Sequence, residues 1–136
     1  MRIELSNSLD ELPRLAEELE QFGESAGLSV KDVMQLNLVL EELVTNTISY
    51  GYEGASGPRS IVVELNRDES GLRVVVEDDA REYDPFQRDE PDLGLPLEQK
   101  PVGGLGVHLV REIMDECRYE RVDGHNRLIL NKVVGS

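Results

Sequence analysis

Two β-rich runs separated by only four residues place the strongest constraint on how this chain folds. SIVVELN (60–66) and GLRVVVED (71–78) are rich in valine and leucine, and the turn sequence RDES (67–70) lies between them. Runs of this composition on either side of a short polar turn are typical of an antiparallel hairpin. The fold is therefore expected to contain antiparallel strands.

A second hairpin is predicted closer to the C-terminus. CRYERV (117–122) and RLILNKVV (127–134) flank DGHN (123–126), a turn signal that includes His125. Residues 1–5 alternate weakly between polar and apolar side chains, as a further strand does.

Three amphipathic segments between these strands predict helices. A Ser-x-x-Glu capping box (residues 8–11) opens the first, which closes at Gly23 and Gly27. Ser29 and Asp32 repeat the start signal for the second, which is predicted over about residues 29–50, and the third is predicted over 107–114. The order of these elements predicts an α+β fold, a two-layer sandwich in which helices cover one face of a mostly antiparallel sheet. The chain length suits a single domain over residues 1–136.

Charge and composition restrict the function classes. The chain has 28 acidic and 14 basic residues, a net charge of −14, which disfavours nucleic-acid binding and membrane docking. A basic protein partner suits this charge, and so does acidity that only maintains solubility. The chain shows no run of about twenty apolar residues and no signal-peptide core, and Cys117 is its single cysteine. These features predict a cytoplasmic protein.

The second predicted helix carries the first candidate site. Glu42 and Asn46 are four residues apart in EELVTN, so both side chains project from one face beside the apolar stripe. The asparagine oxygen is a hard ligand that suits Mg²⁺, and the Glu42 carboxylate could accept a proton from a nucleophile. A solvated face with an ordinary hydrogen bond would produce the same pattern, so both interpretations stay open.

The second candidate site lies where an apolar strand ends in two carboxylates. Asp78 or Asp79, in VVVEDDAREYDP, could accept a hydrogen bond from an exocyclic amine such as the adenine N6 group. The alternative is that the paired aspartates only end the strand and start a turn.

The third candidate site is GGLG (103–106), directly before the third predicted helix. This arrangement presents unpaired backbone N–H groups and the positive helix end to phosphate, and glycine permits close approach. The segment matches neither a Walker sequence nor G-x-G-x-x-G, and a hinge or tight turn is the alternative. The long polar segment before it predicts partial disorder or a functional lid, which we place over residues 84–102.

In this order, the three segments resemble the motifs of the GHKL ATPases, most closely the anti-sigma serine/threonine kinases of the RsbW and SpoIIAB type. LNLVLEELVTNTISYGY is similar to the N-box of that family, and VEDDAREYDP is similar to its Asp-x-Gly box. GGLGVHLVREIMDECRYERVDGHNRLILNK is similar to its glycine box and C-terminal hairpin. The resemblance covers nearly the whole chain, and three ordered motifs are far more specific than one.

The resemblance implies a binding site for ATP and Mg²⁺. It assigns Asn46 as the Mg²⁺ ligand, Glu42 as the general base and Asp78 as the adenine contact. It also implies that the glycine box binds phosphate through its backbone, whereas Lys100 either approaches the phosphates or is simply solvated. The cofactor-binding residues implied in this way are Asn46, Asp78, Ala80, Lys100, Gly103, Gly104, Leu105 and Gly106.

One residue departs from the family pattern. The family usually has glycine two residues after the adenine-binding aspartate, where this chain has Ala80. The backbone passes close to adenine there, so we expect the methyl group to lower nucleotide affinity. Alanine fits most backbone conformations with negative φ, so the site itself should persist.

Two function classes follow from the resemblance. As an enzyme, the protein would phosphorylate a serine or threonine of a STAS-domain antagonist of an anti-sigma factor, and the same surface would alternately hold a sigma factor. As a binding module, it would keep the nucleotide as a structural ligand and sequester its partner. The sequence shows no helix pair with a phosphorylatable histidine before these motifs, which favours the stand-alone regulatory kinases, where homodimers are typical.

Overall fold

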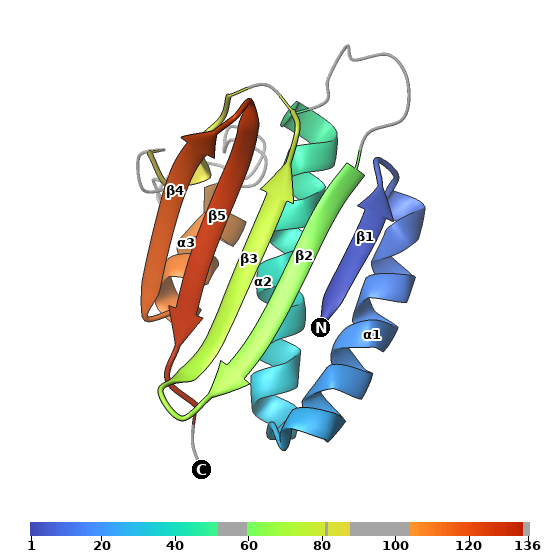
Figure 1. The fold of residues 1–136 in the computed structure, drawn as a ribbon, viewed down its shortest axis with the longest axis vertical. Helices are drawn as coiled ribbons and strands as arrows, with labels where there is room; N and C mark the ends of the chain where they lie inside the picture. The colour runs from blue at the N-terminus through green and yellow to red at the C-terminus, as the bar shows by residue number, and fades with distance from the viewer. Residues whose placement is uncertain (52–59, 81, 88–103, 135–136) are drawn as a thin grey trace.

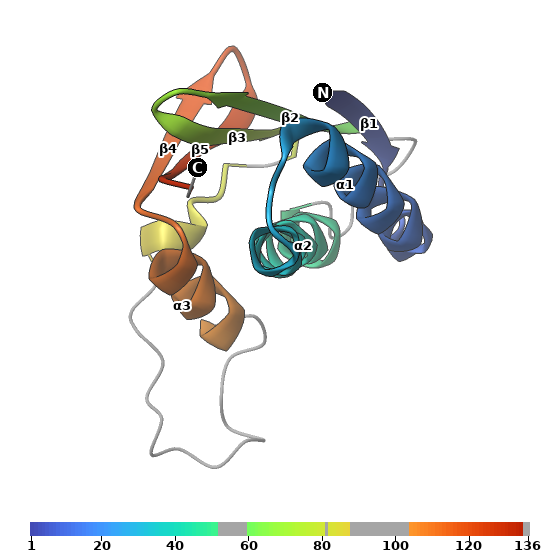
Figure 2. The same cartoon turned by 90° about the horizontal axis from the view of Figure 1, so that it is seen from below.

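The computed structural model describes residues 1–51, 60–80, 82–87 and 104–134 and has two layers, a five-stranded sheet and helices on one of its faces (Figures 1 and 2). The strands are β1 (Arg2–Ser6), β2 (Ser60–Asp68), β3 (Gly71–Asp78), β4 (Glu116–Val122) and β5 (His125–Lys132). The helices are α1 (Leu12–Ala26), α2 (Val30–Asn46) and α3 (Gly104–Ile113), with short turns η1 (Leu9–Glu11), η2 (Thr47–Gly51) and η3 (Pro85–Gln87).

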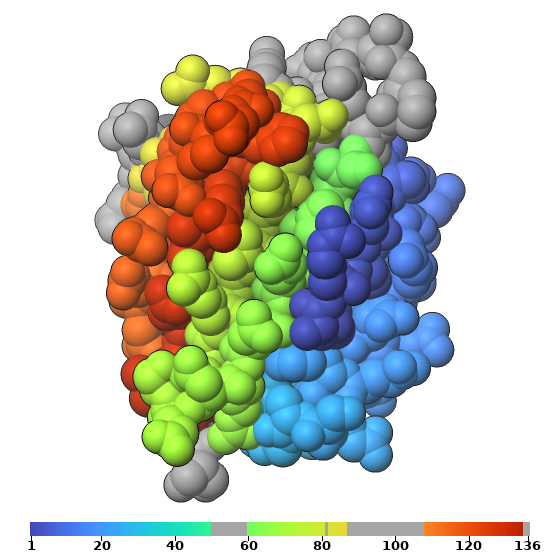
Figure 3. Space-filling model, viewed as in Figure 1, coloured from blue at the N-terminus to red at the C-terminus, as the bar shows by residue number. Residues whose placement is uncertain are grey.

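The sheet has the strand order β1-β2-β3-β5-β4, and each of these neighbouring pairs is antiparallel. The predicted α+β sandwich with helices on one face is therefore confirmed. Figure 3 shows the opposite face of the sheet open at the surface. Within the described ranges, none of the helices is long and apolar enough to span a membrane.

The start of the first helix differs from a capping box. The Ser8 hydroxyl accepts a hydrogen bond from the Asp10 amide at 3.2 Å and begins η1, which precedes α1. The Glu11 carboxylate accepts from the Ser6 amide at 3.0 Å, whereas a capping box would join it to the Ser8 amide. The predicted cap of the second helix is present, because Ser29 accepts from the amide three residues later.

The C-terminal hairpin is tighter than its sequence suggested. Asp123 and Gly124 alone form the turn, with φ angles of 50° and 79°. Two positive φ angles suit Asp-Gly, a favoured two-residue hairpin turn. The assignment of His125 to the turn is therefore wrong, because both His125 and Asn126 belong to β5. This register places Asn126 opposite Asp78 of β3.

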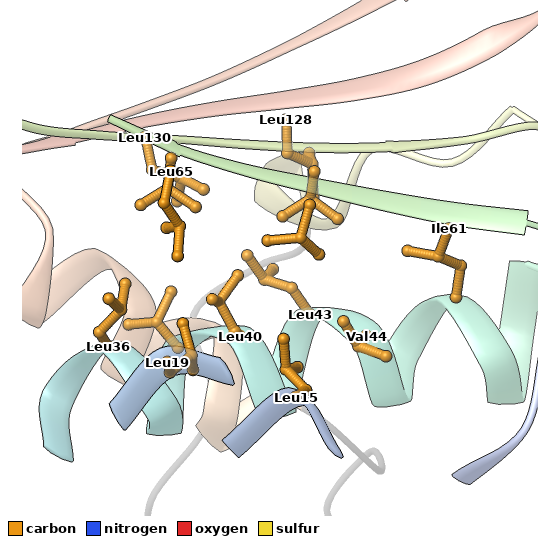
Figure 4. Packing of buried hydrophobic residues seen from close by; sticks show 14 of the residues in the cluster. Leu15, Leu19, Leu36, Leu40, Leu43, Val44, Ile61, Leu65, Leu128 and Leu130 are labelled. Atoms are coloured by element: carbon orange, nitrogen blue, oxygen red, sulfur yellow. The ribbon is translucent and has the colours of Figure 1, made fainter. Parts of the chain in front are cut away.

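Aliphatic side chains fill the space between the sheet and the helices (Figure 4). Side chains of β3 alternate in direction, so that Leu72, Val74 and Val76 face this space together with Asp78. Further fully buried members come from both layers and include Leu5, Leu15, Leu19, Val39, Leu40, Leu43, Val44, Ile61, Val63, Leu65 and Leu130. The polar Asp78 thus ends an apolar row.

Candidate functional site

The buried polar side chains gather at one end of the space between the two layers. Within the described ranges, Asn46, Thr47, Asp78 and Asn126 have exposed fractions of only 4%, 7%, 5% and 4%. They come from the end of α2, the end of β3 and the start of β5, which meet at the upper end of the molecule in Figure 1. Because burial of polar groups costs free energy, such a concentration identifies a candidate functional site.

Asp78 is held by its neighbours through one carboxylate oxygen. Its Oδ1 atom accepts hydrogen bonds from the Ala80 amide at 3.0 Å and from Asn126 Nδ2 at 2.9 Å. The Thr47 hydroxyl lies 3.4 Å from Oδ2 but only 3.1 Å from the Leu43 carbonyl oxygen. A hydroxyl has one proton to donate, and the shorter contact favours the carbonyl. Oδ2 is thus the oxygen with capacity for an incoming donor.

The surroundings of Asp78 act on its protonation in two directions. Burial raises the pKa of the carboxyl above its ordinary value of 3.8. Hydrogen bonds from Asn126 and Ala80, with a smaller contribution from the nearby Thr47 hydroxyl, stabilise the carboxylate and lower the pKa again in part, whereas the neighbouring Asp79 charge raises it. The net direction is upward, so the hydrogen bonds offset only part of the cost of burying the charge.

A small hollow lies in front of Asp78. It is lined by Leu43, Asn46, Thr47, Asp78, Ala80, Tyr83, Pro85, Asn126 and Leu128. Its volume of about 10 Å³ is close to that of a single water molecule. This volume is too small for a nucleobase, and Tyr83 and Pro85 belong to the lining that limits it.

The start of the predicted lid is packed against the rest of the molecule. Pro85 is buried, and Phe86 packs against the core. The Arg111 guanidinium lies over the Phe86 ring, 6.0 Å from its centroid, in a cation–π arrangement. Residues 88–102 of the predicted lid lie outside the described residues.

Asn46 and Glu42 are joined at the edge of the hollow. Asn46 Nδ2 donates to Glu42 Oε1 at 3.2 Å, as the spacing of four residues allows. Glu42 is half-buried and lines a groove of about 260 Å³ between α2 and α3. The groove is lined by Leu38, Val39, Glu41, Glu42, Thr45, Leu109, Val110 and Ile113. The Asn46–Glu42 hydrogen bond thus joins a residue that lines the hollow to a residue that lines the wider groove.

The site suits a metal ion that arrives with phosphate. Within the part of the chain that the structure describes, three or more His, Cys, Asp or Glu side chains do not come together in a metal-binding group. Because Asn46 directs its Nδ2 atom to Glu42, its Oδ1 atom points the other way. Mg²⁺ commonly keeps several waters and binds substrate phosphates together with one or two protein oxygens. A single carboxamide oxygen fits that pattern.

The glycine box forms the first turn of α3. The helix begins at Gly104, so Gly104, Leu105 and Gly106 are helical and do not precede the helix as a loop. The first four N–H groups of a helix have no partner within it, and they lie at its positive end. Lys100 and Gly103 lie outside the described residues.

Ala80 fits its position without backbone strain. It is only 3% exposed and lines the hollow. Among the described non-glycine residues, Asp123 is the one with a positive φ angle, so the Ala80 backbone does not require glycine. The effect of its methyl group on nucleotide affinity remains a prediction.

Asn126 is the main member of the site that sequence reasoning missed. The four-residue turn assignment placed it in a turn, although Asp-Gly alone is a two-residue turn signal. That shorter turn would have placed Asn126 on the same strand face as Leu128 and Leu130. A polar side chain that begins such an apolar row was the available signal.

Comparison with known proteins finds relatives that match most of the chain. The model of the family described as "Histidine kinase-like ATPase domain" matches residues 5–132. The serine/threonine-protein kinase BtrW of Bordetella bronchiseptica is 30% identical over 95 residues, which cover 70% of this chain and 66% of that protein. The serine-protein kinase RsbW of Listeria monocytogenes is 28% identical over 104 residues, covering 74% and 66%. The match thus spans slightly less than two thirds of each relative.

Solved structures share the fold. A crystal structure of the RsbU and RsbW domains of a Mycobacterium tuberculosis protein matches with a TM-score of 0.64 and 16% identity, covering 98% of this chain and 31% of that one. The histidine kinase domain of a blue-light activated kinase from Erythrobacter litoralis matches with a TM-score of 0.57 and 15% identity, covering 93% and 64%.

Proposed function

Because this chain belongs to the histidine kinase-like ATPase domain family, as its sequence motifs predicted, we propose that it is a Mg²⁺-ATP-dependent protein kinase. The observation that carries the proposal is the buried carboxylate of Asp78, which lines the hollow and whose Oδ1 atom is already occupied by two donors. A buried acceptor of this kind suits the exocyclic amine of adenine.

The nucleotide would extend from this hollow past Asn46 toward α3. The amides at the start of α3 would bind phosphate oxygens, and the Asn46 carboxamide oxygen would hold Mg²⁺ against them. The bound metal supplies charge neutralisation on the phosphates. The remaining contribution of the protein is positioning, on which phosphoryl transfer mainly depends.

Glu42 would act on the phosphate acceptor. Its carboxylate lies in the groove between α2 and α3 and is joined to Asn46. We propose that a serine or threonine hydroxyl of the partner enters this groove and that Glu42 accepts its proton. The hydroxyl oxygen then forms a bond to the γ-phosphorus as the bond between this phosphorus and the bridging oxygen breaks, and ADP leaves.

The partner in this proposal is a STAS-domain antagonist of an anti-sigma factor, and a sigma factor would be held alternately. The names of the relatives, serine/threonine-protein kinase and serine-protein kinase, support a protein substrate. A cytoplasmic location and a homodimeric state belong to the same proposal.

Two measurements test the proposal. Titration calorimetry should show one ADP or ATP site per chain, with affinity that falls when EDTA removes Mg²⁺. Incubation with radiolabelled γ-phosphate ATP and the cognate STAS protein should then label a serine or threonine of that protein. The absence of nucleotide binding at millimolar concentration would exclude the site itself.

A second function is favoured by one feature of the hollow. Its volume of about 10 Å³ and the Ala80 side chain in its lining suit a module that binds nucleotide weakly and works by sequestering its partner. Stable complex formation with the STAS protein or the sigma factor, without any phosphate transfer, would support this alternative.

A further inference from the structure

The orientation of the Asn126 side chain is determined by its neighbours. Its Oδ1 atom accepts hydrogen bonds from the Tyr119 hydroxyl at 2.6 Å, from Arg121 Nη1 at 3.0 Å and from the Tyr83 amide at 3.2 Å. Burial raises the pKa of the Tyr119 hydroxyl, which therefore keeps its proton. A flipped amide would direct its NH₂ group at three donors, so this orientation is the stable one.

This orientation of the Asn126 amide directs Nδ2 toward the Asp78 carboxylate. Nδ2 donates to Asp78 Oδ1 at 2.9 Å and lies 3.5 Å from the Ala80 carbonyl oxygen. Arg121 Nη1 donates to that same carbonyl oxygen at 2.8 Å. The start of β5 and the end of β4 together hold the backbone that follows β3. Asp78 lines the hollow with its Oδ1 atom occupied by these partners, so that Oδ2 is the oxygen left to accept from a ligand.

We propose that Asn126 is a positioning residue that makes the site selective for a nucleobase with an exocyclic amino group. By occupying Oδ1, it keeps Asp78 in the orientation and the charged form that accept from such an amine. The inference rests on the proposed nucleotide site and adds a residue that selects the base. Inosine nucleotides, which carry a carbonyl oxygen at the corresponding position, would be rejected because two acceptors would face each other.

Charged groups reach this end of the molecule from several elements. Asp79 follows Asp78 in the chain, and Arg121 comes from β4. Glu82 and Asp84 act on Tyr119, and Glu42 lies beyond Asn46 on α2. A test of Asn126 has to keep these groups unchanged, which a substitution at this one position does.

The variant Asn126→Asp separates selection from folding. The introduced carboxylate keeps the size of the side chain and can still accept from Arg121 and Tyr119, but its second oxygen faces Asp78 Oδ1. Two carboxylates so close share a proton, which Asp78 would carry because Arg121 favours the charged form of the introduced group. The shared proton leaves Oδ2 as the carbonyl oxygen of a neutral acid, which accepts from an amine less strongly, and repels a carbonyl oxygen less, than a carboxylate does. The preference for ADP over inosine diphosphate should therefore fall by about tenfold.

The measurement is calorimetry with Mg²⁺ and either ADP or inosine diphosphate across a pH series. In wild type, the preference for ADP should appear at a lower pH than in Asn126→Asp, where the added charge raises the pKa of Asp78. Asn131→Asp is the matched control, because it makes the same change on β5 at a half-buried position away from the hollow. The control should leave both the preference and its pH dependence unchanged.

A second variant protects the test against misfolding. Tyr119→Phe removes one donor to Asn126 Oδ1 and should weaken ADP binding by about two- to tenfold, with a smaller effect on inosine diphosphate. If both variants retain the wild-type preference at every pH, the role of Asn126 is overturned. A loss that is equal for both nucleotides would assign it a structural role only. If wild type binds neither nucleotide, the proposed function fails first and this inference fails with it.

Discussion

The two ends of the space between sheet and helices have opposite chemistry. Along β3 the inward row begins with Leu72 and ends with Asp78, and along β5 it runs from Leu130 back to Asn126. Along α2 it runs from Leu36 to the polar end of the helix. All three rows change from aliphatic to polar toward the same end. The register of β3 and β5 sets Asp78 opposite Asn126, and the buried Asn46 and Thr47 end the row on α2.

This difference separates residues that stabilise the fold from residues that can bind a ligand. Each large aliphatic side chain at the apolar end contributes on the order of 1.5–3 kcal/mol by leaving water. At the polar end, the same space holds hydrogen-bonded groups whose burial costs free energy unless each is paired. We therefore expect substitutions at the apolar end to change stability and those at the polar end to change function.

The largest effect is expected from Glu42→Gln at the polar end. Glutamine keeps the size and can still hydrogen-bond to Asn46, but it cannot accept the proton of a hydroxyl. Phosphate transfer to the STAS partner should fall by about 10²–10⁴-fold, whereas nucleotide affinity and stability change little. The transfer rate and calorimetry measure both quantities. Glu20→Gln, an exposed site on α1, is the control, and transfer at the wild-type rate in Glu42→Gln would remove this carboxylate from the mechanism.

The largest effect on stability is expected from Leu40→Ala at the apolar end. Leu40 is 0% exposed, so truncation should lower the unfolding free energy by about 2–5 kcal/mol. Urea denaturation measures this loss, and Leu38→Ala, on the same helix but 53% exposed, should change it by less than about 0.5 kcal/mol. Nucleotide affinity of the folded variant should stay near wild type. A strong loss of affinity would show that the two ends are coupled.

Asp78→Asn should change binding and stability in different directions. The asparagine oxygen can still accept from Ala80 and Asn126, so packing is retained. Its NH₂ group would face the exocyclic amine of adenine, and ADP affinity should fall by about 10–100-fold. Near neutral pH the unfolding free energy should stay the same or increase, because a buried charge is removed. Wild-type ADP affinity in this variant would exclude Asp78 as the adenine contact.

The pH dependence of the wild type follows from the raised pKa of Asp78. The folded protein holds this proton to a higher pH than the unfolded chain does. The stabilisation of the fold by protonated Asp78 is therefore complete below the ordinary pKa of 3.8. It is lost as the pH rises through the pKa of the folded protein. ADP affinity should rise over the same window, because binding needs the carboxylate. Across a pH series, denaturation of wild type should show this fall in unfolding free energy, and calorimetry should show the rise in ADP affinity. Asp78→Asn should show neither change.

The smallest effect is expected from Ala80→Gly. Removal of the methyl group from the lining of the hollow should raise nucleotide affinity by a few-fold at most, which is less than about 1 kcal/mol. The more flexible glycine should lower the unfolding free energy by about 0.4–1 kcal/mol. Calorimetry and urea denaturation again measure the two changes. Unchanged or weaker nucleotide binding would show that the methyl group does not obstruct the site.

Local sequence signals were sufficient for much of the architecture. The cap at Ser29, the β2–β3 hairpin and the sandwich of helices on one sheet face were predicted and are present. Each depends on a rule that acts over a few residues, such as capping, alternation or helical periodicity. The pairing of Glu42 with Asn46 also follows from helix geometry alone, since a spacing of four residues places them on one face.

The tertiary structure alone decided which distant residues meet. Asp78 and Asn126 are far apart in the chain, and the register between β3 and β5 brings them to 2.9 Å. Tyr119 and Arg121 then fix the amide, although their sequence marked them only as strand residues. Sequence determined which face each side chain occupies, because alternation and periodicity are local. The alignment of those faces depends on strand pairing and packing across the whole core, which no local rule specifies.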